Sequence, residues 1–234
     1  MSALFILAGL GIALGLVFNH INFIGLHAAV HLRSLEVMPT VLQIERWGHL
    51  EHHRMFPPKA SCQRHRWADP RLYIRRLGKD VDSSLRLLKQ NCWSGLHLLF
   101  YLRATLLFLA YVFIDVLRGE GAFALVEGVI LVGGLLIGFV VHHLVLMLHH
   151  NWLHAGGPFG GWHRLHHEDP RRIFGLWRWC DFEPSDRFLS HLLSELRLAE
   201  RLLKALFPSL SAYWQDHLKQ ARENYQQPSI IEPQ

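Results

Sequence analysis

Two clusters of histidine share the spacing H-x-x-H-H, although more than a hundred residues separate them. The first occupies residues 48–53 (GHLEHH) and the second residues 161–170 (GWHRLHHEDP). Imidazole nitrogens bind iron, copper, nickel and zinc. The chain holds 18 histidines among 234 residues, and the repetition of one spacing favours a metal site over a cluster on the surface.

A pair of histidines precedes each of these two H-x-x-H-H clusters, which we call histidine boxes. His27 and His31 form H-x-x-x-H before the first box, and His150 and His154 form the same pair before the second. Residues four apart lie on the same face of a helix, so each pair can offer two nitrogens to one ion. The chain therefore presents a pair and a box, and then a second pair and a second box.

The geometry of each box allows it to serve two ions. On a helix, the first and second histidines of H-x-x-H-H share a face, while the third turns about 100° away. Ten imidazoles exceed the four ligands of a closed zinc site, whereas two ions with four or five histidines each would use them all. Other histidines have simpler interpretations: polar residues at membrane-helix ends (His20 and His97) and surface residues (His65, His191 and His217).

Three apolar segments must position these histidines. They cover residues 3–30, 96–117 and 123–148, and a membrane helix needs about 20 mainly apolar residues. Only 18% of the chain is charged, compared with about 25% in an average soluble domain. A cleaved signal peptide is disfavoured for the first segment because it has no basic start. The uncharged, glycine-bearing third segment argues against a soluble helical core.

The distribution of basic residues predicts the topology. All Lys and Arg residues except Arg103 and Arg118 lie in residues 31–95 or after residue 151. The positive-inside rule places both regions in the cytosol, and both histidine boxes with them. We therefore expect an all-α integral membrane bundle of three or four transmembrane helices, with a cytosolic helical cap that carries a dimetal site. The net charge of +5 fits apposition to anionic lipid, and no motif favours nucleic acid.

The domain organisation follows from these segments. Residues 1–187 form the expected membrane-embedded catalytic domain, with cytosolic segments at 31–95 and 151–187. Residues 188–234 form an amphipathic helix and a tail, which frays beyond residue 226. Along residues 188–213 the helix has an apolar and a charged face, so it lies on the membrane or against the cytosolic domain. The two faces are Leu189, Leu192, Leu193, Leu196 and Leu203, and Arg197, Glu200, Arg201 and Lys204.

The three cysteines carry no recognisable cofactor motif. Cys62, Cys92 and Cys180 are isolated, without a C-x-x-C pair, so neither a disulfide framework nor a cysteine zinc site is implied. No flavin, haem-attachment or iron–sulfur motif is evident in the sequence either. Any redox reaction would therefore take its electrons from a partner.

Residues 25–182 resemble the superfamily of membrane fatty acid hydroxylases, sterol desaturases and fatty acid desaturases, which are histidine-box non-haem diiron enzymes. The order of pairs and boxes around a membrane hairpin looks most like the fatty acid 2-hydroxylase and sterol desaturase branch. Residues 54–58 (RMFPP), 174–175 (FG) and 179–182 (WCDF) are similar to phrases of that branch. Residues 49–57 also resemble the last box of acyl-lipid desaturases, and the interval between His154 and His163 is short. The superfamily is thus better supported than the branch.

The resemblance implies a function and a ligand set. It implies two iron ions, O2 as co-substrate, and hydroxylation of an unactivated C–H bond in a fatty acyl or other lipid. The alternative reaction is desaturation at the same site. The non-enzymatic alternative is a histidine-rich membrane protein that binds or transports metal ions. Glu51 and Glu168 could hydrogen-bond to ligand histidines and orient them, and His20 or His143 could take the place of one iron ligand. The implied iron ligands are His27, His31, His49, His52, His53, His150, His154, His163, His166 and His167.

The resemblance also implies partners and a location. The substrate is a membrane lipid or fatty acyl group, and the electron donor is a ferredoxin, cytochrome b5 or a reductase. The membrane is the bacterial inner membrane or the endoplasmic reticulum, with the histidine site facing the cytosol. The lipid itself and the carbon attacked are not encoded in a ligand set.

Overall fold

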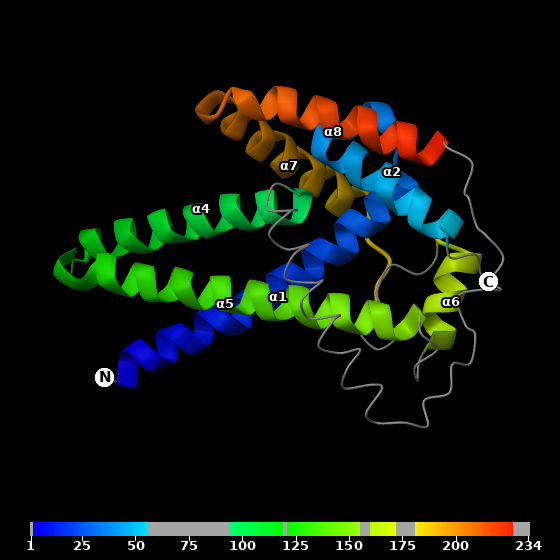
Figure 1. Cartoon of the computed structure of the whole chain (residues 1–234). Coiled ribbons are helices and arrows are strands. Elements are labelled where there is room, and N and C mark those ends of the chain that lie inside the picture. The colour runs from blue at the N-terminus through cyan, green and yellow to red at the C-terminus, as the bar shows by residue number, and fades with distance from the viewer. Residues whose placement is uncertain (1, 56–93, 119–120, 155–159, 172–180, 227–234) are drawn as a thin grey trace.

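The computed structural model describes residues 2–55, 94–118, 121–154, 160–171 and 181–226, and those residues form helices and connecting turns without strands (Figure 1). The all-helical prediction is therefore confirmed for this part of the chain. The elements are α1 (Ser2–Leu32), a 3-10 turn η1 (Leu35–Val37), α2 (Thr40–Met55), α4 (Gly95–Leu117), α5 (Gly121–His154), α6 (Gly160–Glu168), α7 (Asp186–Leu206) and α8 (Ser209–Gln226).

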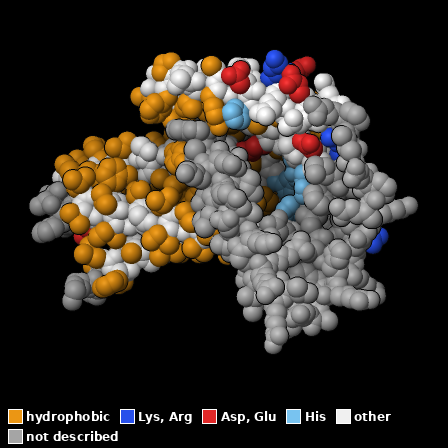
Figure 2. All heavy atoms as spheres, viewed as in Figure 1, with side chains coloured by type: hydrophobic (Ala, Val, Ile, Leu, Met, Phe, Trp, Pro, Cys, Tyr) orange, Lys and Arg blue, Asp and Glu red, His pale blue; other side chains and the backbone are white. Residues whose placement is uncertain are grey.

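Three of the described helices are long and apolar enough to cross a membrane. They are Ala3–Leu32, Gly95–Leu117 and Leu125–His150, which confirms the three segments expected from hydropathy. Large apolar side chains such as Phe5, Phe113 and Leu117 are exposed on their outer faces. Figure 2 shows orange side chains crowded over one end of the molecule, whereas most of the charged side chains visible in this view lie toward the other end. Such a surface is stable in a hydrocarbon environment.

The three spans place the histidine-bearing segments at one end of the bundle. α4 and α5 form a hairpin whose turn lies near the N-terminus of α1, and α1 packs along α5 (Figure 1). α2 follows α1 at the opposite end, and α6 follows α5 there. The two histidine boxes, on α2 and α6, therefore meet beyond the same ends of the spans.

Glycines allow α1 and α5 to approach at backbone distance. Gly11 and Gly15 on α1 face Gly134 and Gly138 on α5. A Cβ added to Gly134 would lie 2.5 Å from the carbonyl oxygen of Ala8 and 3.1 Å from Cα of Gly11. Small residues four apart are a common device for close packing of membrane helices. This contact fixes α5, and hence His150, relative to α1 and its histidines.

The close approach predicts the outcome of a matched pair of substitutions. Gly134→Ala should lower stability, because its methyl group meets backbone that cannot move aside, at a cost of about 1–3 kcal/mol. Gly133→Ala should be neutral or stabilising, because nothing lies within 4 Å of its added Cβ and alanine favours a helix by about 1 kcal/mol over glycine. Thermal unfolding in detergent measures both. Equal melting temperatures for the two variants would contradict the packing described.

The C-terminal region forms two helices, not the single helix expected over residues 188–213. α7 begins at the N-cap Ser185, whose Oγ accepts from the backbone N–H of Phe188 at 3.2 Å. It ends at Leu206, and α8 starts after Pro208, because proline lacks the N–H that would continue the helix. α7 packs against α1 and α4, and α8 packs along α2. The prolyl break lets the chain fold back over α2.

The apolar face predicted for α7 is confirmed, and one charged residue is corrected. Leu189, Leu192, Leu193 and Leu196 are buried in one cluster with residues of α1, α2 and α4. Glu200 was expected on the exposed face but is only 6% exposed. Its carboxylate accepts from the backbone N–H of Val41 on α2 and from Lys204, at 3.4 and 2.5 Å. A helical wheel misses this because α2 covers the position.

An ionic network fastens α7 to two of the spans. Arg103 of α4 donates to Glu195 of α7, with its Nη2 at 2.5 Å, and to Oδ1 of Asn22 on α1 at 2.7 Å. Charged groups in a membrane segment are costly unless they are paired. Arg103 is therefore satisfied at the place where three helices meet.

Candidate metal centre

The structure brings nine of the ten predicted ligands together at the end of the bundle opposite the α4–α5 turn. α1 supplies two, α2 three, α5 one and α6 three. They are His27, His31, His49, His52, His53, His150, His163, His166 and His167. The tenth, His154, is the last residue of α5, and its side chain lies outside the described residues.

One group of nitrogens belongs to His27, His31, His49 and His166, whose potential ligand atoms all lie within 4.8 Å of one another. Nε2 of His49 lies 3.1 Å from Nε2 of His27 and 2.8 Å from that of His31. Nε2 of His53 joins this group, at 2.9 Å from His49 and 3.0 Å from His166. Five imidazoles from three helices thus converge on one small volume.

A second group lies beside the first. His52, His150 and His163 also have potential ligand atoms within 4.8 Å of one another. Nε2 of His167 lies 3.1 Å from Nε2 of His163 and joins this group. The two groups touch where the rings of His53 and His167 approach, with centroids 4.3 Å apart. The arrangement offers two adjacent sites of four or five nitrogens.

The boxes divide between the groups differently from our expectation. In each box the first and third histidines come together, as His49 with His53 and His163 with His167. The middle ones, His52 and His166, reach into the other group. Residues four apart on a helix differ by about 40° and residues three apart by about 60° in the opposite sense. Either pairing suits the helix, and the positions of the neighbouring helices decide between them.

The donor set fits metal ions better than hydrogen bonds. A neutral imidazole carries one N–H, so Nε2 of His49 cannot donate to all of the three nitrogens that surround it within 3.1 Å. Nitrogens that converge so closely suit lone pairs directed at a shared cation. Imidazole is a ligand for iron, copper and zinc alike, so geometry supports a metal without choosing the element.

The protein keeps these rings neutral and able to coordinate. Burial, followed by the charge of neighbouring imidazoles, lowers the pKa of His49 well below its usual range. The same causes lower the pKa of His52 to about 4 and that of His53 to about 2, and they also depress the pKa of His166. A ligand must be deprotonated to bind a metal. At neutral pH these four imidazoles are therefore uncharged, and each has one nitrogen lone pair free to bind a metal.

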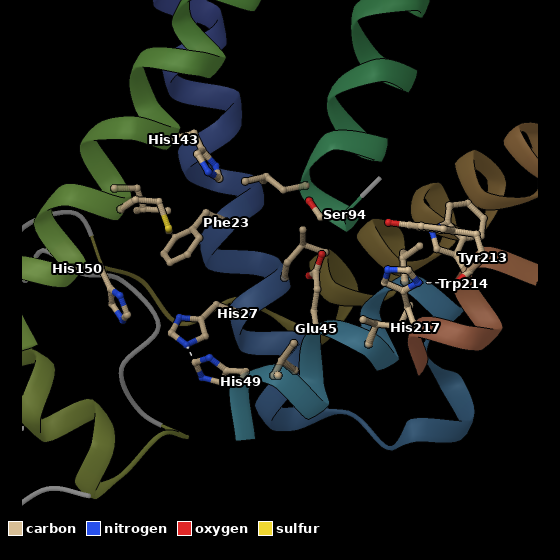
Figure 3. Close-up of a pocket in the computed structure, with 18 of the residues that line it drawn as sticks. Phe23, His27, Glu45, His49, Ser94, His143, His150, Tyr213, Trp214 and His217 are labelled. Atoms are coloured by element: carbon tan, nitrogen blue, oxygen red, sulfur yellow. Dashed lines mark hydrogen bonds between the residues drawn. The ribbon is translucent and has the colours of Figure 1, made fainter. Parts of the chain in front are cut away.

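An apolar cavity of about 480 Å³ opens onto the histidines. His27, His49, His150 and His163 form part of its wall. Figure 3 shows the first three of these on one side, with Tyr213, Trp214 and His217 of α8 on the other. The rest of the wall is mainly apolar and comes from α1, α2, α4 and α5: Phe23, Leu26, Val30, Val41, Ile44, Leu96, Leu146 and Met147. A small-molecule site of this size is typically apolar with a few polar groups.

Glu45 is the acidic residue in the described lining of this cavity. Its Oε1 accepts from the backbone N–H of Gly95, the first residue of α4, at 2.6 Å. Burial raises the pKa of Glu45 to about 7, although this hydrogen bond opposes the shift. Glu45 was not predicted from the sequence. Its place four residues before His49, on the same helix face, was the available signal.

The raised pKa of Glu45 predicts a pH-dependent difference in stability. The folded state holds the proton more tightly than the unfolded state, so the parent should lose stability as pH rises from about 4.5 to about 7. Glu45→Gln keeps an acceptor for Gly95 and removes this titration. The variant should therefore gain melting temperature relative to the parent between about pH 5 and about pH 8. A constant difference across that window would contradict the assignment.

The remaining polar predictions have mixed outcomes. Glu51 and Glu168 pair with Arg54 and Arg164 of their own helices, at 3.6 and 2.7 Å. His191 is exposed as expected, while His217 lines the cavity. Outside the described residues lie His65, the cysteines Cys62, Cys92 and Cys180, the phrases at 56–58 and 174–180, and the tail beyond residue 226.

The histidines of the membrane helices were only partly predicted. Neither His20 nor His143 joins the two metal groups of the described residues. His20 contacts His142, with Nδ1 of the former 3.2 Å from Nε2 of the latter. His97, expected as a polar residue at a membrane-helix end, lies in the first turn of α4 and is buried against its neighbours, at 3% exposed. Hydropathy cannot reveal which face of a span is covered by its neighbours.

Comparison with protein-family models, with curated proteins and with solved structures finds no match for this chain. Function is therefore inferred from the geometry of the histidine groups and the cavity.

Proposed function

We propose that this chain is a membrane non-haem diiron oxygenase that hydroxylates an unactivated C–H bond of a lipid. The observation that carries the proposal is the pairing of two adjacent histidine groups with one apolar cavity. The first group is His27, His31, His49, His53 and His166, and the second is His52, His150, His163 and His167. Members of both groups line the cavity.

The histidines would hold two iron ions, one in each group. Such a centre, when bound, supplies activation of O2 and removal of hydrogen from carbon. The chain's own part is to hold uncharged imidazoles in place, and the low pKa values of His49, His52 and His53 support this. The split boxes on α2 and α6 would tie the two ions together, because each box contributes to both groups. Electrons would come from a separate donor such as a ferredoxin, cytochrome b5 or a reductase.

The cavity would place the substrate and exclude water. Phe23 of α1 and Leu146 and Met147 of α5 line the cavity about one helical turn before His27 and His150 of the same helices, where a hydrocarbon chain could pack. The ring centroids of Phe23 and His27 are 5.5 Å apart, so a chain resting on Phe23 lies beside the first group. Burying apolar surface contributes about 25 cal/mol per Å². A lipid reaching the site from the bilayer is therefore the substrate class that best fits the wall.

Labelled oxygen tests this proposal. The purified full-length chain, supplied with reductant and a lipid extract under isotopically labelled O2, should yield a lipid that has gained one labelled oxygen atom, measured by mass spectrometry. Loss of two hydrogens without a gain of oxygen would instead assign desaturation. Metal transport into vesicles with no change in any lipid would contradict both.

A further inference from the structure

His143 on α5 is a buried polar side chain outside the metal groups. It is 7% exposed, and neither of its ring nitrogens has a hydrogen-bond partner among the residues that the structure describes. The residue lines the apolar cavity. A buried polar group without a partner is costly, and native structures rarely tolerate one without a reason. Two unsatisfied nitrogens at a cavity wall indicate a place for the polar group of a ligand.

A second polar group stands next to it. The rings of His97 on α4 and His143 have centroids 5.8 Å apart. Nδ1 of His97 lies 2.7 Å from Oγ of Ser94, which also lines the cavity. Nε2 of His97 has no hydrogen-bond partner in the described part of the chain. When Ser94 donates to Nδ1, Nε2 carries the hydrogen. Ser94, His97 and His143 thus form a string of polar groups next to the apolar part of the wall, and Ser94 and His143 line the cavity itself.

This polar end is separate from the metal groups. His143 precedes His150 by seven residues on α5, so both lie on nearly the same helix face, about 10 Å apart along the axis. In Figure 3, Phe23 lies between His143 and His27, and His143 points into the cavity from above. A ligand with a polar end at His143 would extend its hydrocarbon past Phe23 toward His150.

The charges of the lining select the kind of polar group. Among the described lining residues there is no Lys or Arg, and the carboxyl group there is that of Glu45. A fatty acid carboxylate at His143 would find no Lys or Arg of this lining to pair with and would be repelled by an ionised Glu45. A hydroxyl both donates and accepts, which matches an imidazole that has one N–H and one lone pair. An uncharged polar group therefore fits better than an anion.

We propose that His143 binds the polar group of an uncharged long-chain lipid, of which a primary alcohol is the simplest example. This inference rests on the proposed function, since it names the substrate class of that site. It assigns His143 a positioning role: by holding the polar end, it sets which carbons of the chain lie beside His150. The attacked carbon would lie along the chain and not next to the polar group.

Binding to the full-length protein tests the inference without activity. Radiolabelled hexadecanol and hexadecanoate are each partitioned between empty nanodiscs and nanodiscs that hold the chain. The parent should bind the alcohol more tightly than the acid. His143→Leu should weaken alcohol binding by about tenfold, the effect of one lost hydrogen bond, and leave acid binding unchanged. His143→Gln, which keeps a donor and an acceptor, should retain most of the preference, and the exposed Val145→Leu should match the parent.

Equal binding of the two probes by the parent would overturn the inference, and this measurement needs no variant to fold. Unchanged alcohol binding by folded His143→Leu would also overturn it. Iron content is measured on the same samples. If the chain binds the alcohol selectively but takes up no iron, the proposed function is contradicted and the lipid-binding site stands. If it takes up iron but does not prefer the alcohol over the acid, the binding site is contradicted and the proposed function stands.

Discussion

His166→Ala should lower the iron content from close to two ions per chain to below about one. His166 is 2% exposed and belongs to the first group, together with histidines of α1 and α2. Its Nε2 also lies 3.0 Å from that of His53. Loss of an outer-sphere partner of a ligand already costs about 10–100-fold in metal affinity. Loss of a central ligand should cost more.

The variant should keep its fold, which separates metal loss from unfolding. The main hydrophobic cluster draws on α1, α2, α4, α5, α7 and α8, and α6 contributes nothing to it among the described residues. Helical circular dichroism should therefore match the parent. His191→Ala is the matched control, because the His191 side chain is 72% exposed and belongs to neither metal group of the described residues. The control should keep both ions.

Metal analysis of the detergent-purified proteins decides the outcome. Stoichiometric zinc in the parent, or iron retained by His166→Ala, would contradict a diiron centre built from these residues. If His166→Ala and His191→Ala lose the same amount of iron, the iron of the parent was bound nonspecifically by histidines and not at this site. The three proteins are therefore measured side by side after the same removal of loosely bound metal.

The histidines could be predicted from the sequence because their chemistry is unusual and their spacing is local. The pairs His27/His31 and His150/His154 and the two boxes are visible without any neighbour. The assignment of each histidine to one of the two metal groups could not be predicted from the sequence. His52 and His166 exchange groups because α2 and α6 approach each other, and helix spacing permits both pairings. The three spans were predictable for the reason that hydropathy over about 20 residues is a local property.

Features that depend on contact between distant segments were missed. Glu200 is buried because α2 covers it, and His97 because α5 does, with Phe139 and His143 against its ring. The glycines of α5 were visible, but their partners on α1 at Gly11 and Gly15 became meaningful only when the two helices were seen to cross. The break at Pro208 was also missed, although a proline at this position is by itself a local signal that the helix ends.

Gly48→Phe should block substrate access while leaving the iron in place. Gly48 lines the cavity one residue before His49, and nothing lies within 4 Å of a Cβ added there. A larger side chain can therefore enter the cavity without displacing backbone. A pocket buries most of the surface of a small ligand, so a phenyl ring in a cavity of about 480 Å³ competes directly with the lipid. Product formation should fall by at least about tenfold.

The series Gly48→Ala, Gly48→Leu and Gly48→Phe should reduce product formation in that order, at constant iron content, because each side chain fills more of the cavity. Gly133→Phe is the matched control: it lies on a span, and its added Cβ also meets nothing within 4 Å. It should keep both iron and activity. Full activity in Gly48→Phe with two irons bound would show that the lipid reaches the histidines by another route. The combination of retained iron and lost turnover, by contrast, is expected only if this cavity leads the hydrocarbon to the metal centre.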